Sequence, residues 1–506
     1  MISEFDTLLA CPEKLTGSPP RRYSRFEGQF INGAWRPGKR GRKLTDNDPY
    51  TGQTLTQIEL ADQSDLDEAY QTAAKAQAAW QHALPVQRAA VMLRCATILE
   101  ERRDEIVEWL IRESGSTRTK ADGEWQWVRA VTLEAASFAH HVRGDILPID
   151  VTGKESRVYR QPVGVIGVIS PWNYPSYLSQ RAIAPAIALG NSVVLKPAQD
   201  TPITGGLLLA KVFEEAGLPG GVLNVVVGSS SDIGDAFVQH PIPRLIAFTG
   251  STEVGRHVAA LAAGAPMMKR VTLELGGNSP VVILRDADLA QAVRGAAYGR
   301  FLHQGQICMS SNRIIVDAEV YDEFIERFAE HVSALKFGNP HDPDTAVGPV
   351  INSRQLERMI GYMDASRRAR ARQVLGAPPD GLVLPPHVFS GVTNEMPIAK
   401  NETFGPIAAV ISASGDAHAL QLANDTEYGL SSAVFTRDHA RGLQFALGLQ
   451  AGMTHINDAT VNDSPNSPFG GEKNSGIGRY GGEWIMREFT TEHWVTLQHT
   501  PRRYPF

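Results

Sequence analysis

The chain has 506 residues, a formal net charge of −6 and 42% hydrophobic side chains, which is typical of a globular protein with several domains. No apolar run approaches the roughly 18 residues that a membrane helix needs, so the sequence predicts no membrane partner. No block of Lys and Arg is long enough to indicate a nucleic-acid partner, and the Arg-rich residues 367–372 are interpreted as a solvated helix face.

The three cysteines, Cys11, Cys95 and Cys308, are too scattered for a disulfide framework. Their use favours a reducing, cytoplasmic location. Residues 1–28 carry acidic side chains and lack the apolar core of a signal peptide, and the Pro-Pro-Arg-Arg stretch at 19–22 is interpreted as a flexible lead-in.

The first half of the chain changes from a helical pattern to an alternating one. Amphipathic helices are expected from Asp65, from Pro85 and over residues 123–141. Strands are then expected at residues 163–170, 192–196, 222–227 and 245–248, with helices at 177–189, at 203–216 and from Ser251. Strands that alternate with helices of this length predict a doubly wound parallel sheet, so the fold class is α/β.

The alternation restarts beyond Gly277. A strand is expected at 280–284, followed by a helix that runs to Cys308 and a strand at 312–316. These elements begin a second α/β unit, which is expected to end near Asn457. Residues 489–498 have a strand pattern without a local partner, so they are expected to pair elsewhere in the chain or with another subunit.

Cys308 and Glu274 stand in contexts that suit covalent catalysis. Cys308 follows a Gly/Gln-rich turn, and Glu274 precedes two glycines. A thiol is a soft nucleophile and a carboxylate can activate water, which are the two groups that covalent oxidation of an aldehyde needs. The alternative is that Cys308 is a buried, inert cysteine, the commoner fate of a free thiol.

Two segments are candidates for binding phosphate. Residues 476–481 match G-x-G-x-x-G, but they follow a loop rather than a strand, so they are interpreted as a structural turn. Residues 248–252, Phe-Thr-Gly-Ser-Thr, end a strand and begin a helix, where free backbone N–H groups favour a diphosphate. An ordinary Ser/Thr helix cap is the alternative.

Two further polar residues follow predicted strands of the same sheet. Lys196 lies at the carboxyl end of its strand, where open α/β sheets bind ligands, and it could reach a ribose hydroxyl or a phosphate. Asn173 lies between two prolines and offers an uncharged N–H₂ donor for an oxyanion. Taken singly, each is more often a solvated lysine or a turn asparagine.

Together, these motifs resemble the aldehyde dehydrogenase superfamily. The resemblance extends in order from about Gly33 to about Gln498 and rests on Pro-Trp-Asn-Tyr-Pro at 171–175, Lys-Pro at 196–197, Phe-Thr-Gly-Ser-Thr at 248–252, Leu-Glu-Leu-Gly-Gly at 273–277, Phe-x-x-x-Gly-Gln-x-Cys at 301–308, Asn-Glu-Thr-Phe-Gly-Pro at 401–406 and Pro-Phe-Gly-Gly-Glu-Lys-Asn-Ser-Gly at 468–476.

The resemblance implies two doubly wound parallel-sheet domains and a small β arm that builds homodimers or homotetramers. It assigns residues 1–146 and 162–276 to a cofactor-binding domain, 277–457 to a catalytic domain, 147–161 and 486–506 to the arm, and 458–485 to a loop at the substrate entrance with a turn back to the cofactor domain.

The resemblance also implies roles for individual residues, and it implies no metal site. Cys308 matches the nucleophile, Glu274 the general base and Asn173 the oxyanion donor, with NAD or NADP as cofactor. The expected cofactor contacts are Ile169, Ser170, Pro171, Trp172, Lys196, Gln199, Gly228, Phe248, Gly250, Ser251, Leu275, Glu402 and Phe404.

The chain departs from the family pattern at two positions. Gln199 stands where many NAD-dependent members have a glutamate that would repel a 2′-phosphate, so NADP becomes admissible. His303 stands where Asn is more usual, five residues before Cys308, which makes a Cys–His pair conceivable.

The substrate is expected to be a small aldehyde with an aromatic ring. Residues 457–469 and 481–484 resemble the corresponding loops of benzaldehyde- and vanillin-type members. An aliphatic aldehyde or a semialdehyde is the alternative, as are a CoA-acylating enzyme, an ester or thioester hydrolase, and a catalytically silent protein on this fold. The expected pocket residues are Trp127, Tyr174, Ile307, Met309, Asp463 and Phe469.

Overall fold

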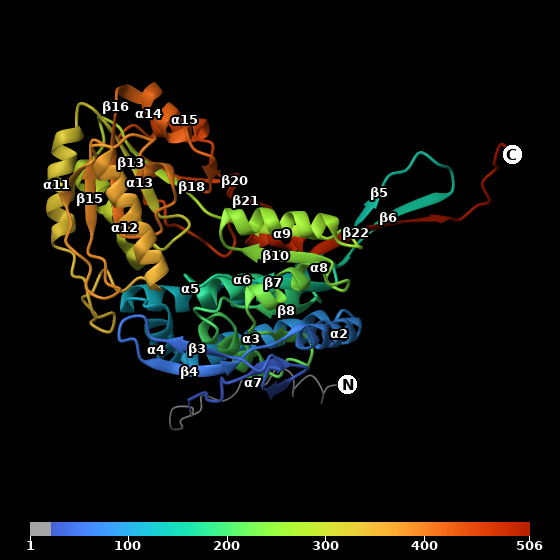
Figure 1. Cartoon of the computed structure of the whole chain (residues 1–506). Coiled ribbons are helices and arrows are strands. Elements are labelled where there is room, and N and C mark those ends of the chain that lie inside the picture. The colour runs from blue at the N-terminus through green and yellow to red at the C-terminus, as the bar shows by residue number, and fades with distance from the viewer. Residues whose placement is uncertain (1–21) are drawn as a thin grey trace.

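The computed structural model of the chain describes residues 22–506 as two mainly parallel sheets with helices on their faces and a β arm that projects away from them (Figure 1). Residues 1–21, which include Cys11 and most of the expected lead-in, lie outside the described residues. None of the helices within residues 22–506 is both long enough and apolar enough to cross a membrane.

The first sheet has eight strands in the order β2-β1-β9-β8-β7-β10-β11-β21. The strands from β9 to β11 run parallel, and the edge strands pair antiparallel. The four strands that the alternation predicts are confirmed as β7, β8, β9 and β10. The bounds are β1 (Gln29–Ile31), β2 (Ala34–Arg36), β7 (Val165–Ile169), β8 (Ser192–Lys196), β9 (Leu223–Val225), β10 (Leu245–Thr249), β11 (Arg270–Glu274) and β21 (Gly476–Ile477).

Helices cover both faces of the first sheet, which is why its central strands are apolar throughout. The first helix begins at a capping box, in which the Asp62 carboxylate accepts from the N–H groups of Ser64 and Asp65. The helices are α2 (Gln63–Trp80), α3 (Pro85–Glu101), α4 (Arg103–Ser114), α5 (Arg118–His141), α6 (Pro175–Ala188), α7 (Leu208–Glu215), α8 (Asp235–Gln239), α9 (Thr252–Gly264) and α16 (Gly482–Glu488).

The second sheet has seven strands in the order β14-β15-β16-β13-β12-β18-β19. All of its neighbouring strands except β14 and β15 pair in parallel, which confirms the second α/β unit. Its strands are β12 (Ser279–Ile283), β13 (Ser311–Asp317), β14 (Arg372–Leu375), β15 (His387–Ser390), β16 (Ile407–Ala413), β18 (Ser431–Phe435) and β19 (Met453–Ile456). Its helices are α10 (Leu289–Phe301), α11 (Tyr321–Ser333), α12 (Ser353–Arg368), α13 (Pro397–Lys400), α14 (Gly415–Asn424) and α15 (His439–Gly448).

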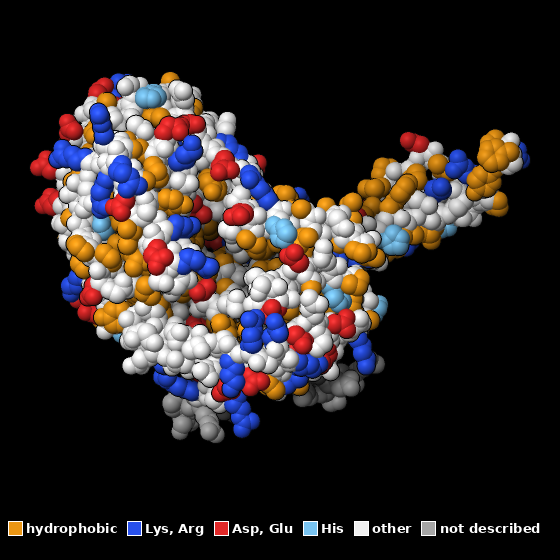
Figure 2. Space-filling view, in the orientation of Figure 1, with side chains coloured by type: hydrophobic (Ala, Val, Ile, Leu, Met, Phe, Trp, Pro, Cys, Tyr) orange, Lys and Arg blue, Asp and Glu red, His pale blue; other side chains and the backbone are white. Residues whose placement is uncertain are grey.

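The arm is a three-stranded sheet of β5 (Asp145–Leu147), β6 (Lys154–Pro162) and β22 (Thr490–Gln498). The tail strand β22 pairs antiparallel with β6 from Thr490 opposite Pro162 to Gln498 opposite Lys154, so its partner lies in the same chain. Hydrophobic side chains such as Ile146 are exposed on the arm (Figure 2).

The remaining short strands form connections. The hairpin of β3 (Lys43–Asn47) and β4 (Thr54–Glu59) is a separate two-stranded sheet, and β17 (Tyr428–Gly429) pairs with β20 (Glu472–Lys473). The G-x-G-x-x-G segment forms β21 at the edge of the first sheet and then a turn in which Gly478 and Gly481 have positive φ. It is therefore not the strand-to-helix turn of a dinucleotide fingerprint.

Candidate active site

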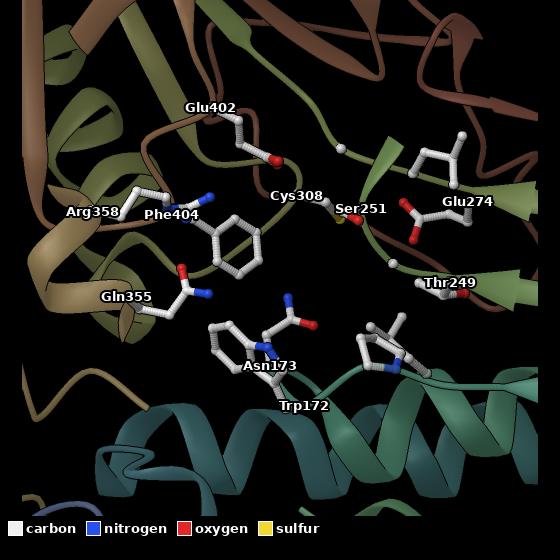
Figure 3. A pocket seen from close by; sticks show the side chains of 15 residues that line it. Trp172, Asn173, Thr249, Ser251, Glu274, Cys308, Gln355, Arg358, Glu402 and Phe404 are labelled. Carbon is white, nitrogen blue, oxygen red and sulfur yellow. The ribbon is translucent and has the colours of Figure 1, made fainter. Parts of the chain in front are cut away.

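A pocket opens where the carboxyl ends of β7, β10 and β11 face the second α/β unit. This is the place at which open parallel sheets bind ligands. Its lining residues are Pro171, Trp172, Asn173, Leu178, Thr249, Gly250, Ser251, Glu274, Leu275, Gly276, Cys308, Gln355, Arg358, Glu402 and Phe404. The side chains of Cys308, Glu274 and Asn173 point toward the same space (Figure 3).

Cys308 lies on an irregular turn rather than on a helix. The helix expected to reach it, α10, ends at Phe301, and a 3₁₀ turn follows over Leu302–Gly305. His303 and Gln304 have φ of 50° and 57°, left-handed values that end the α-helix. The Gln304 amide donates to the carbonyls of Gly115 and Pro349, at 3.0 and 2.8 Å, which holds this strained turn in place.

The Cys308 thiol is half-buried, and burial together with the adjacent Glu274 carboxylate raises its pKa well above the usual value. The resting side chain is therefore a protonated thiol. The imidazole nitrogens of His303 make no hydrogen bond to Cys308, and the ring packs edge-on against Tyr174 at 5.6 Å. The structure therefore contains no Cys–His pair at this position.

Glu274 ends β11, and its carboxylate faces the pocket (Figure 3). Burial raises its pKa to about 7, while the guanidinium of Arg181 and the thiol of Cys308 limit the rise. A carboxyl group with this pKa is partly ionised near neutral pH, which is the state that a general base requires.

Asn173 follows β7 at a turn that a buried ion pair holds. Its Nδ2 donates to the carbonyl of Gln306 at 2.9 Å, which engages one of the two N–H donors of the amide. Lys120 donates to the backbone carbonyl of Asn173 at 2.8 Å and pairs with Glu124, whose carboxylate also accepts from the Ser176 N–H. The amide is therefore fixed beside the backbone that leads to Cys308.

Seven of the thirteen expected cofactor residues line the pocket: Pro171, Trp172, Gly250, Ser251, Leu275, Glu402 and Phe404. The rings of Phe404 and Trp172 meet edge to face at 5.4 Å, and Phe404 has a positive φ of 50°. The Glu402 carboxylate accepts from the Gly277 N–H at 3.0 Å.

The other six are not among the residues that line the pocket. Ile169 and Ser170 end β7, and the Phe248 ring lies so close beneath Gly250 that a Cβ there would be 2.6 Å from it. Gln199 is half-buried in the turn after β8, and Gly228 packs against Ile233 after β9.

Lys196 provides an independent indication that an anionic or hydroxyl-bearing group fits here. Its side chain is 4% exposed, its one hydrogen bond within residues 22–506 is to Ser230 Oγ at 3.4 Å, and burial lowers its pKa to about 8. At the start of α9, the N-cap Ser251 makes no side-chain capping bond, so its hydroxyl remains available. A dinucleotide with its phosphates at this helix end fits these residues.

Aromatic side chains gather on the other side of Cys308. Trp127 from α5 stacks on Tyr174 at 5.6 Å and lies 5.3 Å from Tyr177. Cys308 packs against the hydrophobic cluster that contains Tyr174, Ile307, Met309 and Phe469. The Tyr177 hydroxyl donates to Asp463 at 2.6 Å. None of the six residues expected in the substrate pocket is among the lining residues given above. Trp127 and Tyr174 stack on each other, Ile307 and Met309 flank Cys308 in sequence, and Asp463 and Phe469 both lie beside Arg181.

Several residues of the site were not singled out by the sequence. Gln355 and Arg358 reach the pocket from α12, which belongs to the second unit and carries no motif (Figure 3). Thr249 and Gly276 lie inside two recognised motifs without having been assigned a role, and Leu178 lies three residues beyond a third motif. Arg181 lies one turn beyond Tyr177, and only its place on an apolar, fully buried helix could have marked it.

Comparisons with known proteins agree with this geometry. Residues 35–495 match the aldehyde dehydrogenase family. The chain is 51% identical to a vanillin dehydrogenase of Corynebacterium glutamicum over 93% of this chain and 97% of that protein. It therefore belongs to the aldehyde dehydrogenase family, and its two sheets and arm form the aldehyde dehydrogenase fold.

Two solved structures are also similar. The crystal structure of an NAD-dependent benzaldehyde dehydrogenase from Corynebacterium glutamicum has a TM-score of 0.88 and 47% identity, covering 95% of this chain and 98% of that one. A salicylaldehyde dehydrogenase from Pseudomonas putida G7, complexed with salicylaldehyde, has a TM-score of 0.92 and 38% identity, covering 94% and 99%.

Proposed function

We propose that the chain is an NAD(P)-dependent dehydrogenase that oxidises aromatic aldehydes to carboxylic acids. The observation that carries this proposal is the convergence of the Cys308 thiol, the Glu274 carboxylate and the Asn173 amide beside an aromatic cluster. Vanillin, benzaldehyde and salicylaldehyde are the substrates named for the three similar proteins.

The chain's own residues carry the covalent steps. Because the Cys308 thiol is protonated at rest, its proton must leave as sulfur attacks the aldehyde carbon, and Glu274 is the carboxylate that faces it. The oxygen of the tetrahedral adduct accepts from the second N–H of Asn173 and from the backbone N–H of Cys308. Loss of hydride turns the adduct into the thioester, and Glu274 passes the thiol proton to solvent and is ionised again. A water activated by Glu274 then hydrolyses the thioester, which releases the acid and returns a proton to the Cys308 sulfur.

The bound nicotinamide supplies the hydride acceptor for the oxidation. In this proposal Phe404 and Trp172 hold the ring end, Ser251 and the start of α9 hold the diphosphate, and Lys196 and Glu402 contact ribose hydroxyls. Gln199 carries no charge, so it does not repel a 2′-phosphate, and both NAD and NADP are admissible. The unit built on the first sheet is proposed to bind the cofactor, and the unit built on the second to supply Cys308.

The rival reactions are less well supported. A CoA-acylating enzyme has no need for a base beside the thioester, yet Glu274 faces Cys308. A hydrolase has no need for the cofactor residues. An aliphatic aldehyde or semialdehyde remains the alternative substrate, and the ring cluster of Trp127, Tyr174 and Tyr177 favours an aromatic one.

The proposal also covers the assembly of the protein through its arm and its location in the cell. The exposed side chains of Ile146, Leu147 and Trp494 on the arm are proposed to be buried in a homodimer or homotetramer. Cys95 and Cys308 are both unpaired, which supports a cytoplasmic location.

The test is a panel of aldehydes assayed with NAD and with NADP. Benzaldehyde, vanillin and salicylaldehyde are expected to exceed acetaldehyde and a semialdehyde in kcat/KM by about 100-fold, because burying a ring adds apolar area worth a few kcal/mol. The product should be the free acid even when CoA is present. Equal efficiency on acetaldehyde and benzaldehyde would overturn the substrate class.

A further inference from the structure

Arg181, on α6, lies between two buried carboxylates, at ion-pair distance from each and hydrogen-bonded to neither. Its Nη2 is 3.7 Å from Glu274 Oε2, and its Nη1 is 3.6 Å from Asp463 Oδ2. The side chains of Arg181, Glu274 and Asp463 are 3%, 1% and 3% exposed. None of the three guanidinium nitrogens has a hydrogen-bond partner among residues 22–506. Burying a cation this deeply destabilises the folded protein unless nearby negative charges compensate for the lost hydration.

Aromatic rings hold the guanidinium in this place. Its central carbon lies 4.4 Å from the ring centre of Phe469, 4.5 Å from that of Tyr480 and 5.5 Å from that of Tyr177. Rings exclude water while attracting a cation through their faces. Because Arg181 and both carboxylates are almost fully buried, the charge of Arg181 acts on both with little screening by bulk solvent.

We propose that Arg181 is a positioning residue for the general base: its guanidinium stabilises ionised Glu274, and Asp463 opposes this by attracting the same cation. The inference rests on the proposed function, because it assumes that Glu274 activates water. It gives Arg181 and Asp463 opposite effects on one step, the hydrolysis of the thioester.

Arg181 and Asp463 shift the pKa of Glu274 in the opposite directions that the proposal requires. Burial raises the pKa of Glu274 to about 7, Arg181 lowers that pKa, and the charge of Asp463 raises it. Burial also raises the pKa of Asp463, and Arg181 and the Tyr177 hydroxyl lower it. The charged or titratable groups that face Glu274 or Arg181 are Tyr177, Cys308, Glu402, Asp463 and Tyr480.

The first measurement is the pH profile of kcat under conditions in which thioester hydrolysis limits turnover. Hydrolysis needs ionised Glu274, so kcat should rise with pH through the pKa of Glu274, near 7. Arg181→Met removes the stabilising charge, so the midpoint should move up by about one to three pH units. Arg181→Lys keeps a cation and should restore most of that shift.

The second variant gives an effect of opposite sign. Asp463→Asn removes the competing carboxylate and leaves Arg181 to Glu274 alone, so the midpoint should move down. General damage to the fold cannot produce opposite shifts from two neighbouring substitutions. If Arg181→Met does not fold, Asp463→Asn still decides: a downward midpoint supports the proposal, and an unmoved one overturns it.

Gln180→Met is the matched control. Gln180 is the buried neighbour of Arg181 on α6, and its amide donates to Thr132 at 2.8 Å, so its loss perturbs packing without changing a charge near Glu274. Its midpoint should equal that of the wild type. Unmoved midpoints in both charge variants, or shifts of the same sign, would overturn the proposal.

Glu274→Gln separates this inference from the proposed function. It should release one equivalent of reduced cofactor per site in a burst and then stall, because the thioester is not hydrolysed. Unchanged steady turnover in Glu274→Gln would refute Glu274 as the base, and the inference with it. A normal burst and stall combined with unmoved midpoints in the Arg181 and Asp463 variants would refute this inference alone.

Discussion

The two regions that flank Cys308 are built in different ways. On the cofactor side, short contiguous segments follow β7, β10 and β11, and their backbone shapes the pocket. On the aromatic side, Trp127 comes from α5, Tyr174 and Tyr177 come from the start of α6, and Asp463 comes from the loop that follows β19. Backbone geometry constrains short motifs strongly, whereas an aromatic cluster can be assembled from many combinations of residues. The cofactor side therefore characterises the family, and the aromatic side should set the substrate.

The largest effect should come from the residue that both regions share. Cys308→Ala should reduce aldehyde oxidation by more than about 1,000-fold, because the covalent partner is lost, while cofactor binding measured by fluorescence stays intact. Cys95→Ala is the control, since Cys95 is fully buried in α3 and should affect stability only. Turnover of Cys308→Ala above about a thousandth of wild type would show that Cys308 is not the nucleophile that the two regions share.

Asn173→Ala should have the next largest effect. Loss of one oxyanion donor typically lowers kcat by about 100- to 1,000-fold. Asn173→Asp keeps the size of the side chain but removes the N–H₂ donor, so it should be comparably slow. Both variants should retain the thermal unfolding midpoint of the wild type to within a few degrees. A loss below tenfold in kcat would show that another group holds the oxyanion.

Phe469→Ala tests the aromatic side alone. The ring is buried and lies in the cluster against which Cys308 packs, so its removal should lower the ratio of kcat/KM for benzaldehyde over acetaldehyde by about tenfold. Acetaldehyde oxidation should fall less than benzaldehyde oxidation, although it too depends on Arg181, which the Phe469 ring contacts at 4.4 Å. An equal loss on both aldehydes would mean that Phe469 acts through the fold or through Arg181 and does not touch the substrate ring.

Gln199→Glu should give the smallest change in turnover and tests the cofactor side alone. A carboxylate in the turn after β8 would repel a 2′-phosphate and accept from ribose hydroxyls, so the preference for NAD over NADP should rise by up to about tenfold. Because the site lies away from Cys308, kcat should be unchanged. Gln199→Met, which adds no charge, serves as the control and should leave that preference where it was.

Much of the fold and the cofactor side could be predicted from the sequence. The strands β7, β8 and β10 are apolar, short and followed by turn residues, and parallel strands that are covered on both faces have this pattern. The helix predicted to reach Cys308 was wrong, because α10 contains good helix formers and the left-handed values of His303 and Gln304 depend on tertiary contacts.

The aromatic side could be predicted only in part. Trp127, Tyr174 and Phe469 were expected there from the resemblance, and the structure stacks Trp127 on Tyr174 and buries Phe469. Arg181 was missed because a charged residue in an apolar helix has no motif, and its meaning depends on Glu274 and Asp463, which come from distant segments. Gln355 and Arg358 were missed for the same reason, since α12 belongs to the other α/β unit.

The pairing of β6 with β22 also affects how the chain is made. The two strands join positions 330 and 338 residues apart in the sequence, as in the bonds from Arg160 to Thr490 and from Trp494 to Ser156. At synthesis rates of about 5–20 residues per second, β6 emerges from the ribosome tens of seconds before its partner strand exists. During that interval only the short β5 can cover one of its edges. The arm can therefore be completed only after β22 has been made. Until then the nascent protein exposes an unpaired edge of β6, which must avoid pairing with other nascent chains on the same mRNA.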